Sequence, residues 1–184
     1  MEKVSVAELL KKDITGKVIC FPTDTVYGVG AIVGDSAAID KIYAMKKRDY
    51  SKPLAILTPN KNIDKYVVYT NSECYKLMKD GWPGALTLIF KKSGIVGYDI
   101  TSGLDTVAFR MPNSEIALMI LEYFGPLATT SVNLSGEAPI NNLAEIEDKF
   151  SKYIDYLVID KEEIKGTPSR IIDVSGDYIK VIRN

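Results

Sequence analysis

The chain has 184 residues, of which 46% are hydrophobic and 26% are charged, the profile of a globular protein. A net charge of −1 excludes a protein that coats nucleic acid with its whole surface. No apolar run approaches the roughly 18 residues that a membrane span needs, and the first residues lack the apolar core of a signal peptide. We therefore expect a cytoplasmic protein with no membrane contact, folded as one domain over residues 1–184.

The chain contains no histidine and only two cysteines. This composition excludes Ser-His-Asp and Cys-His nucleophiles, the commonest zinc ligand and a tetrahedral thiolate metal site. Cys20 and Cys74 fall in a predicted strand and a predicted helix, so we expect two buried thiols and no disulfide. The remaining chemistry belongs to Lys, Arg, Ser, Thr, Asn and carboxylates, which favours positioning and charge stabilisation.

The first elements are a short helix and a buried strand. Residues 5–12 open with Ser-Val-Ala-Glu, a capping-box pattern, and predict a helix. Residues 17–21 form a β-branched and apolar run, which predicts a strand. Pro22 ends the ladder of that strand, and Gly28 and Gly30 allow unusual backbone angles or a close approach to a ligand. The polar stretch between them is typical of a ligand-binding strand end, although an ordinary strand-to-helix turn explains it equally well.

A second helix is predicted to begin at Asp35 or Ser36, either of which can cap its first turn. One face of this helix carries apolar side chains at helical spacing, namely Ile39, Ile42 and Tyr43. Lys46 falls on the same face, so its side chain is expected to point toward the sheet, which is unusual for lysine.

The end of this helix decides where two cations point. If the helix continued, Lys46 and Arg48 would diverge, because positions two apart face different directions on a helix. Pro53 disfavours helix at the preceding residue, so we predict that the helix ends close to Lys47 and that the two cations converge. A solvated helix end is the alternative explanation of the local basic patch, whose members are Lys41, Lys46, Lys47, Arg48 and Lys52.

Strands and helices alternate through the rest of the chain. Further strands are predicted at residues 54–57, 86–90, 106–111, 127–131, 156–160, 170–174 and 178–183, the last two joined by a hairpin turn. Further helices are predicted at residues 72–79, from a cap at 113 or 114 to 123, and from 142 onward. This order predicts one α/β domain, α+β in character, whose sheet is mixed rather than purely parallel.

Polar side chains stand at the carboxyl ends of three predicted strands, namely Thr23, Arg110, and Ser131 with Asn133. Such ends gather on one edge of an α/β sheet, so we expect these groups to converge there with Lys46 and Arg48. Hydroxyls, an amide and several cations suit a phosphate-bearing ligand. Ser131 lacks the histidine base and the Gly-x-Ser-x-Gly elbow of a catalytic serine. Taken alone, Ser131 and Asn133 would be assigned to turn hydrogen bonds.

Six motifs occur in a fixed order along the chain. They are Phe21-Pro22-Thr23-Asp24-Thr25-Val26-Tyr27-Gly28, Lys46-Lys47-Arg48, Lys52-Pro53-Leu54, Trp82-Pro83-Gly84, Arg110-Met111-Pro112, and Ser131-Val132-Asn133-Leu134-Ser135-Gly136. Together they closely resemble the YrdC-like family, to which the TsaC type of threonylcarbamoyl-AMP synthase belongs, over residues 16–183. Each motif alone is weak, but the ordered set is highly specific.

The resemblance implies a twisted, mixed β-sheet flanked by helices, with a concave basic face. It also implies an enzyme that joins L-threonine, bicarbonate and ATP into threonylcarbamoyl-AMP and releases pyrophosphate. A downstream threonylcarbamoyl transferase complex then modifies the adenosine beside the anticodon of tRNA. No acidic cluster of metal-site spacing is visible in the sequence, so Mg²⁺ is expected to arrive with ATP.

The resemblance also assigns site residues, position by position. The catalytic Lys-x-Arg and Ser-x-Asn elements correspond to Lys46, Arg48, Ser131 and Asn133. Positions that hold L-threonine in the family correspond to Thr23, Arg110, Thr129 and Ser169. ATP contacts correspond to Lys46, Arg48, Lys52, Thr106, Ser131 and Arg183. Leu57 stands where many members carry a histidine near threonine, and Arg170 stands where a threonine is usual.

Two other functions are open at this point. Binding of tRNA or double-stranded RNA is also ascribed to the family's concave face, and it would make the protein a binding module without catalysis. The near-neutral charge and the absence of an aromatic RNA-binding motif favour the enzyme. A relative that uses carbamoyl phosphate is the third possibility, and the lack of accessory zinc or acylphosphatase-like segments argues against it.

Overall fold

The computed structural model describes residues 1–69 and 72–184. Its strands are β1 (Glu2–Val4), β2 (Ile19–Phe21), β3 (Gly28–Ile32), β4 (Ala55–Leu57), β5 (Val67–Val68), β6 (Leu86–Lys92), β7 (Thr106–Arg110), β8 (Leu127–Ser131), β9 (Tyr156–Val158), β10 (Arg170–Asp173) and β11 (Lys180–Arg183). Its helices are α1 (Val6–Leu9), α2 (Ser36–Lys46), α3 (Glu73–Gly81), α4 (Tyr98–Thr101), α5 (Glu115–Phe124) and α6 (Leu143–Phe150).

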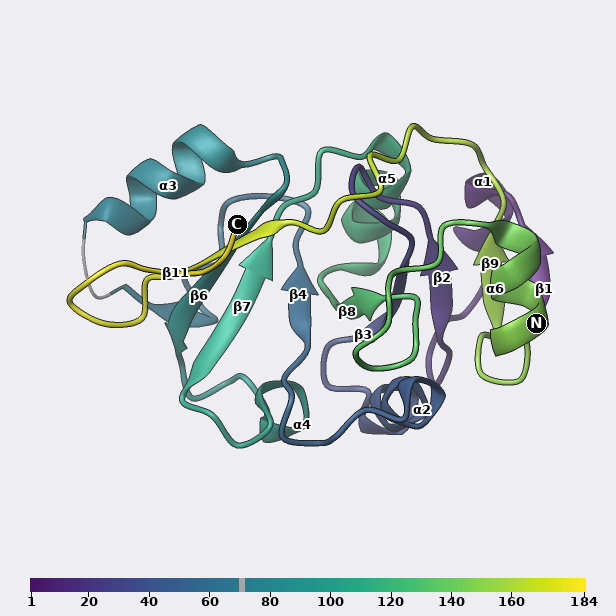
Figure 1. The fold of residues 1–184 in the computed structure, drawn as a ribbon, viewed down its shortest axis with the longest axis horizontal. Helices are drawn as coiled ribbons and strands as arrows, with labels where there is room; N and C mark the ends of the chain where they lie inside the picture. Colours follow the sequence, from purple (N-terminus) through teal and green to yellow (C-terminus); the bar gives the residue numbers. More distant parts are fainter. Residues whose placement is uncertain (70–71) are drawn as a thin grey trace.

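These strands form one twisted sheet that runs along the length of the molecule (Figure 1). The order across it is β1-β9-β2-β3-β8-β4-β7-β6-β10-β11, and β5 pairs with β6 outside this path. The pairs β1–β9, β2–β9, β4–β7 and β6–β10 are parallel, and β3–β8, β4–β8 and β6–β7 are among the antiparallel ones. The mixed sheet with flanking helices confirms the predicted fold class.

Each face of the sheet contributes to a different hydrophobic cluster, because successive side chains of a strand point to opposite faces. Ile19 and Phe21 of β2 belong to the cluster that contains α1 and α5, whereas Cys20 between them belongs to the cluster that contains α2. Leu57 and Ile56 of β4 divide in the same way. Helices α1 and α5 therefore cover part of one face of the sheet, and α2 packs on the other.

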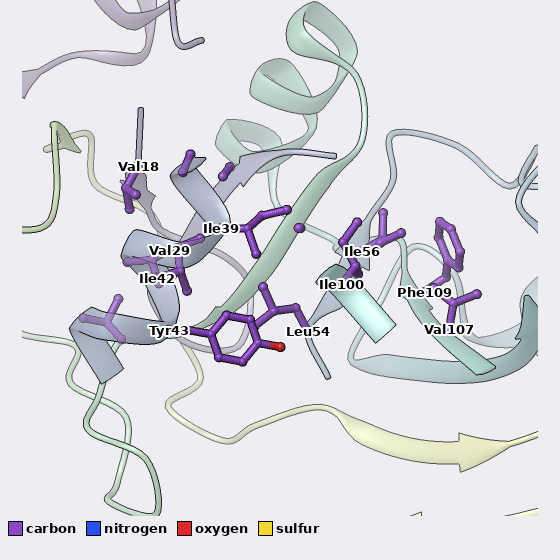
Figure 2. Packing of buried hydrophobic residues seen from close by; sticks show 14 of the residues in the cluster. Val18, Val29, Ile39, Ile42, Tyr43, Leu54, Ile56, Ile100, Val107 and Phe109 are labelled. Atoms are coloured by element: carbon purple, nitrogen blue, oxygen red, sulfur yellow. The ribbon is translucent and has the colours of Figure 1, made fainter. Parts of the chain in front are cut away.

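Helix α2 begins where the sequence predicts. Asp35 caps it by accepting a hydrogen bond from the backbone N–H of Ala38 at 3.1 Å. The predicted apolar face packs on the sheet, and Figure 2 shows Ile39, Ile42 and Tyr43 lying against Val29 and Leu54.

The same helix also ends where predicted. Lys47 takes the left-handed conformation with φ 47° and ψ 40°. The N–H of Lys47 bonds to Ala44 O and the N–H of Arg48 bonds to Tyr43 O, the paired bonds of a Schellman motif. This left-handed residue turns the chain sharply, so that Arg48 leaves the helix direction that Lys46 still follows.

Most later elements match their predicted ranges within a few residues. Strand β8 coincides with residues 127–131, and β10 and β11 form the predicted hairpin. Helix α5 is capped by Ser114 and stops at Gly125, and α6 is capped by Asn142.

The first helix is shorter than predicted. Ser5 forms the expected capping box with Glu8, but α1 ends at Leu9 rather than continuing to Lys12. Its last turn is closed by bonds from Lys11 N to Glu8 O and from Lys12 N to Leu9 O, the tighter spacing of a 3₁₀ turn.

Strand β3 was not predicted, and the interpretation of residues 22–30 as one turn was therefore wrong. Neither Gly28 nor Gly30 has a positive φ. A Cβ atom added at Gly28 would lie 3.1 Å from Thr129 Cγ2, and one at Gly30 would lie 3.1 Å from Thr129 Oγ1. The glycines thus admit the side chain of a neighbouring strand, and their low strand propensity hides β3 from a sequence-based prediction. The short elements β1, β5 and α4 were missed as well.

Cys20 and Cys74 are buried and not joined in a disulfide, as predicted. Burial raises the pKa of the Cys20 thiol, which keeps it unreactive. Within the described part of the chain, the helices are too short or too polar to span a lipid bilayer.

Replacing Lys47 by glycine is expected to stabilise the protein by about 1 kcal/mol, because a side chain in the left-handed region costs that much and glycine avoids the cost. The measurement is the urea midpoint of unfolding at unchanged slope. Lys47→Val serves as the opposite control, since a β-branched side chain is worse there and should lower the midpoint. A Lys47→Gly variant less stable than the parent would contradict the assigned conformation.

Candidate active site

A cavity of about 400 Å³ lies on one face of the central strands. Its floor consists of alternate residues of four strands, namely Ala55 and Leu57, Thr87 and Ile89, Ala108 and Arg110, and Thr129 and Ser131. The intervening positions carry larger apolar side chains, such as Ile56, Leu88 and Phe109, which are buried in the cluster on the opposite face. Five of these eight floor residues are alanine, serine or threonine, which leaves room for a ligand, while the other face fills the core.

Loops complete the lining of this cavity. Residues from the segment after β2 are Thr23, Thr25 and Val26, and those from the segment after α2 are Arg48, Pro53 and Leu54. Residues after β8 are Asn133, Glu137 and Pro139, and the C-terminal part adds Pro168, Ser169, Ile171 and Arg183. Three arginines and one acidic residue stand in this lining, so the cavity is basic as predicted.

Arg110 is fixed by bonds to three different partners. Its Nε donates to Gly84 O at 2.9 Å and its Nη1 to Thr25 Oγ1 at 2.6 Å. Its Nη2 forms an ion pair with Asp24, and both side chains are more than nine-tenths buried. Burial lowers the pKa of Arg110 while Asp24 opposes that shift, so the guanidinium stays charged. Its plane is therefore held in one orientation beneath the cavity.

Arg183 and Ser169 form a second polar cluster at the C-terminal end of the sheet. Arg183 donates from Nε and Nη2 to Ser169 O at 2.9 and 2.7 Å. The Ser169 hydroxyl lies 2.7 Å from Thr87 Oγ1 on β6. The β10–β11 hairpin brings Arg183 over the floor strands in this way, although it is the penultimate residue of the chain.

Arg48 is held at the rim by the chain that follows it. Its Nε donates to Lys52 O at 3.0 Å and its Nη2 to Pro53 O at 2.9 Å. Burial lowers the pKa of Arg48 as well. Arg48 is among the lining residues and Lys46 is not, so of the two cations predicted to converge only Arg48 reaches the cavity.

Ser131 and Asn133 form a hydrogen-bonded unit after β8. The Ser131 hydroxyl donates to Asn133 Oδ1 at 2.7 Å, and Asn133 Nδ2 donates to Glu137 O at 2.7 Å. Lys46 reaches this unit from α2, with its Nζ 2.6 Å from Asn133 Oδ1. Burial and the charge of Arg48 lower the pKa of Lys46 to about 7.

The prediction that these groups share one sheet edge is wrong. Strand β4 is parallel to β7 but antiparallel to β8, so the carboxyl ends of β7 and β8 point to opposite edges. Arg110 and Ser131 nevertheless line the same cavity, because the cavity extends across the sheet face rather than along one edge.

The structure brings together eight of the predicted site residues in the lining, namely Thr23, Arg48, Arg110, Thr129, Ser131, Asn133, Ser169 and Arg183. Lys46, Lys52 and Thr106 are not among the lining residues. Sequence reasoning missed Thr25 and Thr87, which contact Arg110 and Ser169. The position of Thr87 between Leu86 and Leu88, as a hydroxyl in an otherwise apolar run, was the available signal for Thr87.

The chain is similar in sequence to proteins of one known family. The family described as Sua5_yciO_yrdC, telomere recombination, matches residues 13–184. A putative threonylcarbamoyl-AMP synthase of Methanocaldococcus jannaschii is 38% identical over 187 residues, which cover 99% of this chain and 86% of that protein. The threonylcarbamoyl-AMP synthase of Pyrococcus abyssi is 37% identical over 162 residues, which cover 87% of this chain and 48% of that protein.

A solved structure agrees with these relatives in fold. The crystal structure of P. abyssi Sua5 complexed with L-threonine superposes with a TM-score of 0.91 at 31% identity, covering 100% of this chain and 57% of that one. The present chain thus spans about half the length of the P. abyssi proteins that it matches. On the extent of the family match and the identity to its M. jannaschii relative, this chain belongs to the Sua5/YciO/YrdC family.

Proposed function

We propose that this chain is a threonylcarbamoyl-AMP synthase, which condenses L-threonine, bicarbonate and ATP and releases pyrophosphate. The observation that carries the proposal is a single cavity lined by the guanidinium groups of Arg48, Arg110 and Arg183 together with Ser131 and Asn133. All three substrates carry an anionic group, and fixed guanidinium groups recognise phosphates and carboxylates well. The names of the relatives supply the reaction type.

In the proposed reaction, the amine of L-threonine and bicarbonate form a carbamate with loss of water, and a carbamate oxygen then attacks the α-phosphorus of ATP. The new oxygen–phosphorus bond forms as the bond from the α-phosphorus to the bridging oxygen breaks, and that oxygen leaves with pyrophosphate. Negative charge builds up on the phosphoryl oxygens and on the leaving group. Arg48 and Arg183 are assigned to this charge. The second proton of Asn133 Nδ2, and the Ser131 hydroxyl once it turns away from Asn133 Oδ1, are assigned as donors to phosphate or carbamate oxygens.

Arg110 is assigned to the carboxylate of L-threonine, since a planar guanidinium can pair with a carboxylate through two parallel bonds. Thr23, Thr129 and Ser169 supply hydroxyls in the same cavity. Leu57 also lines it, so an apolar side chain stands where the family's histidine is expected. The methyl group of threonine is a suitable neighbour for Leu57.

Mg²⁺ is assigned to the MgATP substrate rather than to a site on the protein. Within residues 1–69 and 72–184, no group of three or more His, Cys, Asp or Glu side chains is placed to hold a metal ion. Mg²⁺ is commonly bound through substrate phosphates and waters. The nucleotide contacts of Lys52 and Thr106 stay predictions. Neither residue lines the cavity, so they could contact only a part of ATP that extends beyond it.

The product of the proposed reaction is a mixed anhydride of a carbamate and AMP, an activated donor that needs an amine acceptor. We assign its use to a separate transferase complex that modifies the adenosine beside the anticodon of tRNA. The step would then belong in the cytoplasm, and this chain itself would need no contact with tRNA or with a membrane.

Pyrophosphate release from MgATP and bicarbonate is expected to require L-threonine, because the attacking group is its N-carboxylated form. The measurement is a coupled pyrophosphate assay with and without threonine, with serine as the control for side-chain recognition. Release that does not need threonine would contradict the proposal. If folded protein releases none under any condition, affinity for RNA with a steep salt dependence becomes the function to test.

Arg48→Met is expected to lower kcat/KM by about 100-fold, the usual cost of removing one preorganised charge stabiliser. Lys47→Met is the matched control, since it removes one positive charge from the neighbouring exposed side chain. Steady-state kinetics and the unfolding midpoint are measured for both. Equal kinetics in the two variants would remove Arg48 from the site.

Arg110→Lys is expected to raise the KM for threonine by tenfold or more, since a charged hydrogen bond contributes roughly 1.5–3 kcal/mol and lysine lacks the planar fork. The KM for ATP should change much less, because the assigned partner of Arg110 is the amino acid. Initial rates at varied threonine and varied ATP separate the two effects. A change confined to the KM for ATP would reassign Arg110 to the nucleotide.

A further inference from the structure

Lys46 is among the most buried side chains of the protein, with a relative exposure of 1%. It does not line the cavity, whereas Arg48, two residues later, does. An ammonium group so far from water must find compensating partners inside the protein. Its partners therefore indicate what it does.

All three partners of Lys46 Nζ belong to one short segment. The distances are 2.6 Å to Ser131 O, 3.0 Å to Asn133 O and 2.6 Å to Asn133 Oδ1. In its protonated form Lys46 has three protons to donate, and each of these oxygens accepts one. No proton is left for a phosphate or a carboxylate.

The main chain of Lys46 holds the same segment. The N–H of Ser135 donates to Lys46 O at 2.9 Å. Lys46 thus fixes residues 131–135 at four points, and Ser131 and Asn133 of this segment line the cavity. To contact a substrate, Nζ would have to release at least one of these oxygens. Asn133 Oδ1 would keep its bond from the Ser131 hydroxyl, whereas a buried carbonyl oxygen left without a partner costs about 1–3 kcal/mol.

We infer that Lys46 is a positioning residue, which acts on the reaction through Ser131 and Asn133 and does not touch ATP. The two cations of the Lys-x-Arg element then have different roles. Lys46 holds the 131–135 segment in place by hydrogen bonds, and Arg48 faces the ligand. This inference rests on the proposed function only for its kinetic consequence. The structural part, that Lys46 fixes the segment, stands independently of the reaction.

The test compares Lys46→Met, Lys46→Gln, Arg48→Met and the control Lys47→Met. In the ligand-free protein, hydrogen exchange is followed at the amides of Val132, Ser135 and Ile140, which bond to Tyr27 O, Lys46 O and Val132 O. Lys46→Met is expected to speed the exchange of these amides at least tenfold relative to amides of α5, and Arg48→Met and Lys47→Met should not. The kcat of Lys46→Met should fall about 100-fold, because Ser131 and Asn133 would no longer be held in position.

Lys46→Gln separates positioning from charge. It keeps two N–H donors on a side chain one bond shorter, so partial protection of the segment and partial activity should return together. A phosphate contact would instead leave Gln as inactive as Met, because both lack the charge. If Lys46→Met does not fold, Lys46→Gln is compared with the parent in its place.

A double-variant cycle gives the second readout. If Lys46 acts through the segment, Lys46→Met lowers kcat by a much smaller factor in an Asn133→Ser background than in the parent. An independent substrate contact would instead lower kcat by the same factor in both backgrounds. Normal protection of the segment in an inactive Lys46 variant, or the same factor in both backgrounds, would overturn the inference. If the parent protein shows no turnover, the proposed function fails, and the exchange comparison still decides whether Lys46 positions the segment.

Discussion

The ammonium of Lys46 can be buried only because three oxygens of residues 131–133 surround it. The same hydrogen bonds that stabilise the buried charge also determine where Ser131 and Asn133 lie. Asp24 plays a comparable part at the other side of the cavity, where it pairs with Arg110. Both charges lie behind the lining, and each fixes a polar group that lies in it. Buried charges that are paired and hydrogen-bonded in this way give one defined arrangement of the cavity wall.

The cavity itself results from the period of two in the central strands. Ala55 and Ala108 leave space on one face, while Ile56 and Phe109 fill the core on the other. Gly28 continues this pattern into β3, where an added Cβ would lie only 3.1 Å from Thr129 Cγ2. The loops at both edges can then reach over a floor of small residues, which explains how strands of opposite direction contribute to a single site.

The sequence predicted those features that depend on neighbouring residues, such as the end of a helix and its buried face. Pro53 and the apolar face of α2 are enough to predict that the helix ends at Lys47 and that Lys46 points toward the sheet, and the structure confirms both. The relation between β7 and β8 was not predictable, because strand order and direction depend on pairings far apart in the chain. For the same reason, the sequence identified Lys46 as part of a motif but not as a residue outside the cavity lining. That distinction depends on which backbone oxygens lie next to Nζ, and no side-chain pattern records their position.

The charge balance of the lining bears on how a triphosphate would fit. Asp24 already compensates Arg110, and the charge of Lys46 is directed at the 131–133 oxygens. With Arg110 assigned to the amino acid, Arg48 and Arg183 are left to face the triphosphate, and Glu137 is the acidic residue of the lining. These two cations cannot neutralise the several negative charges of ATP, so under the proposed reaction the remainder falls to the Mg²⁺ that accompanies the nucleotide. The protein then contributes directed guanidinium groups at the reacting phosphate, where orientation matters more than total charge.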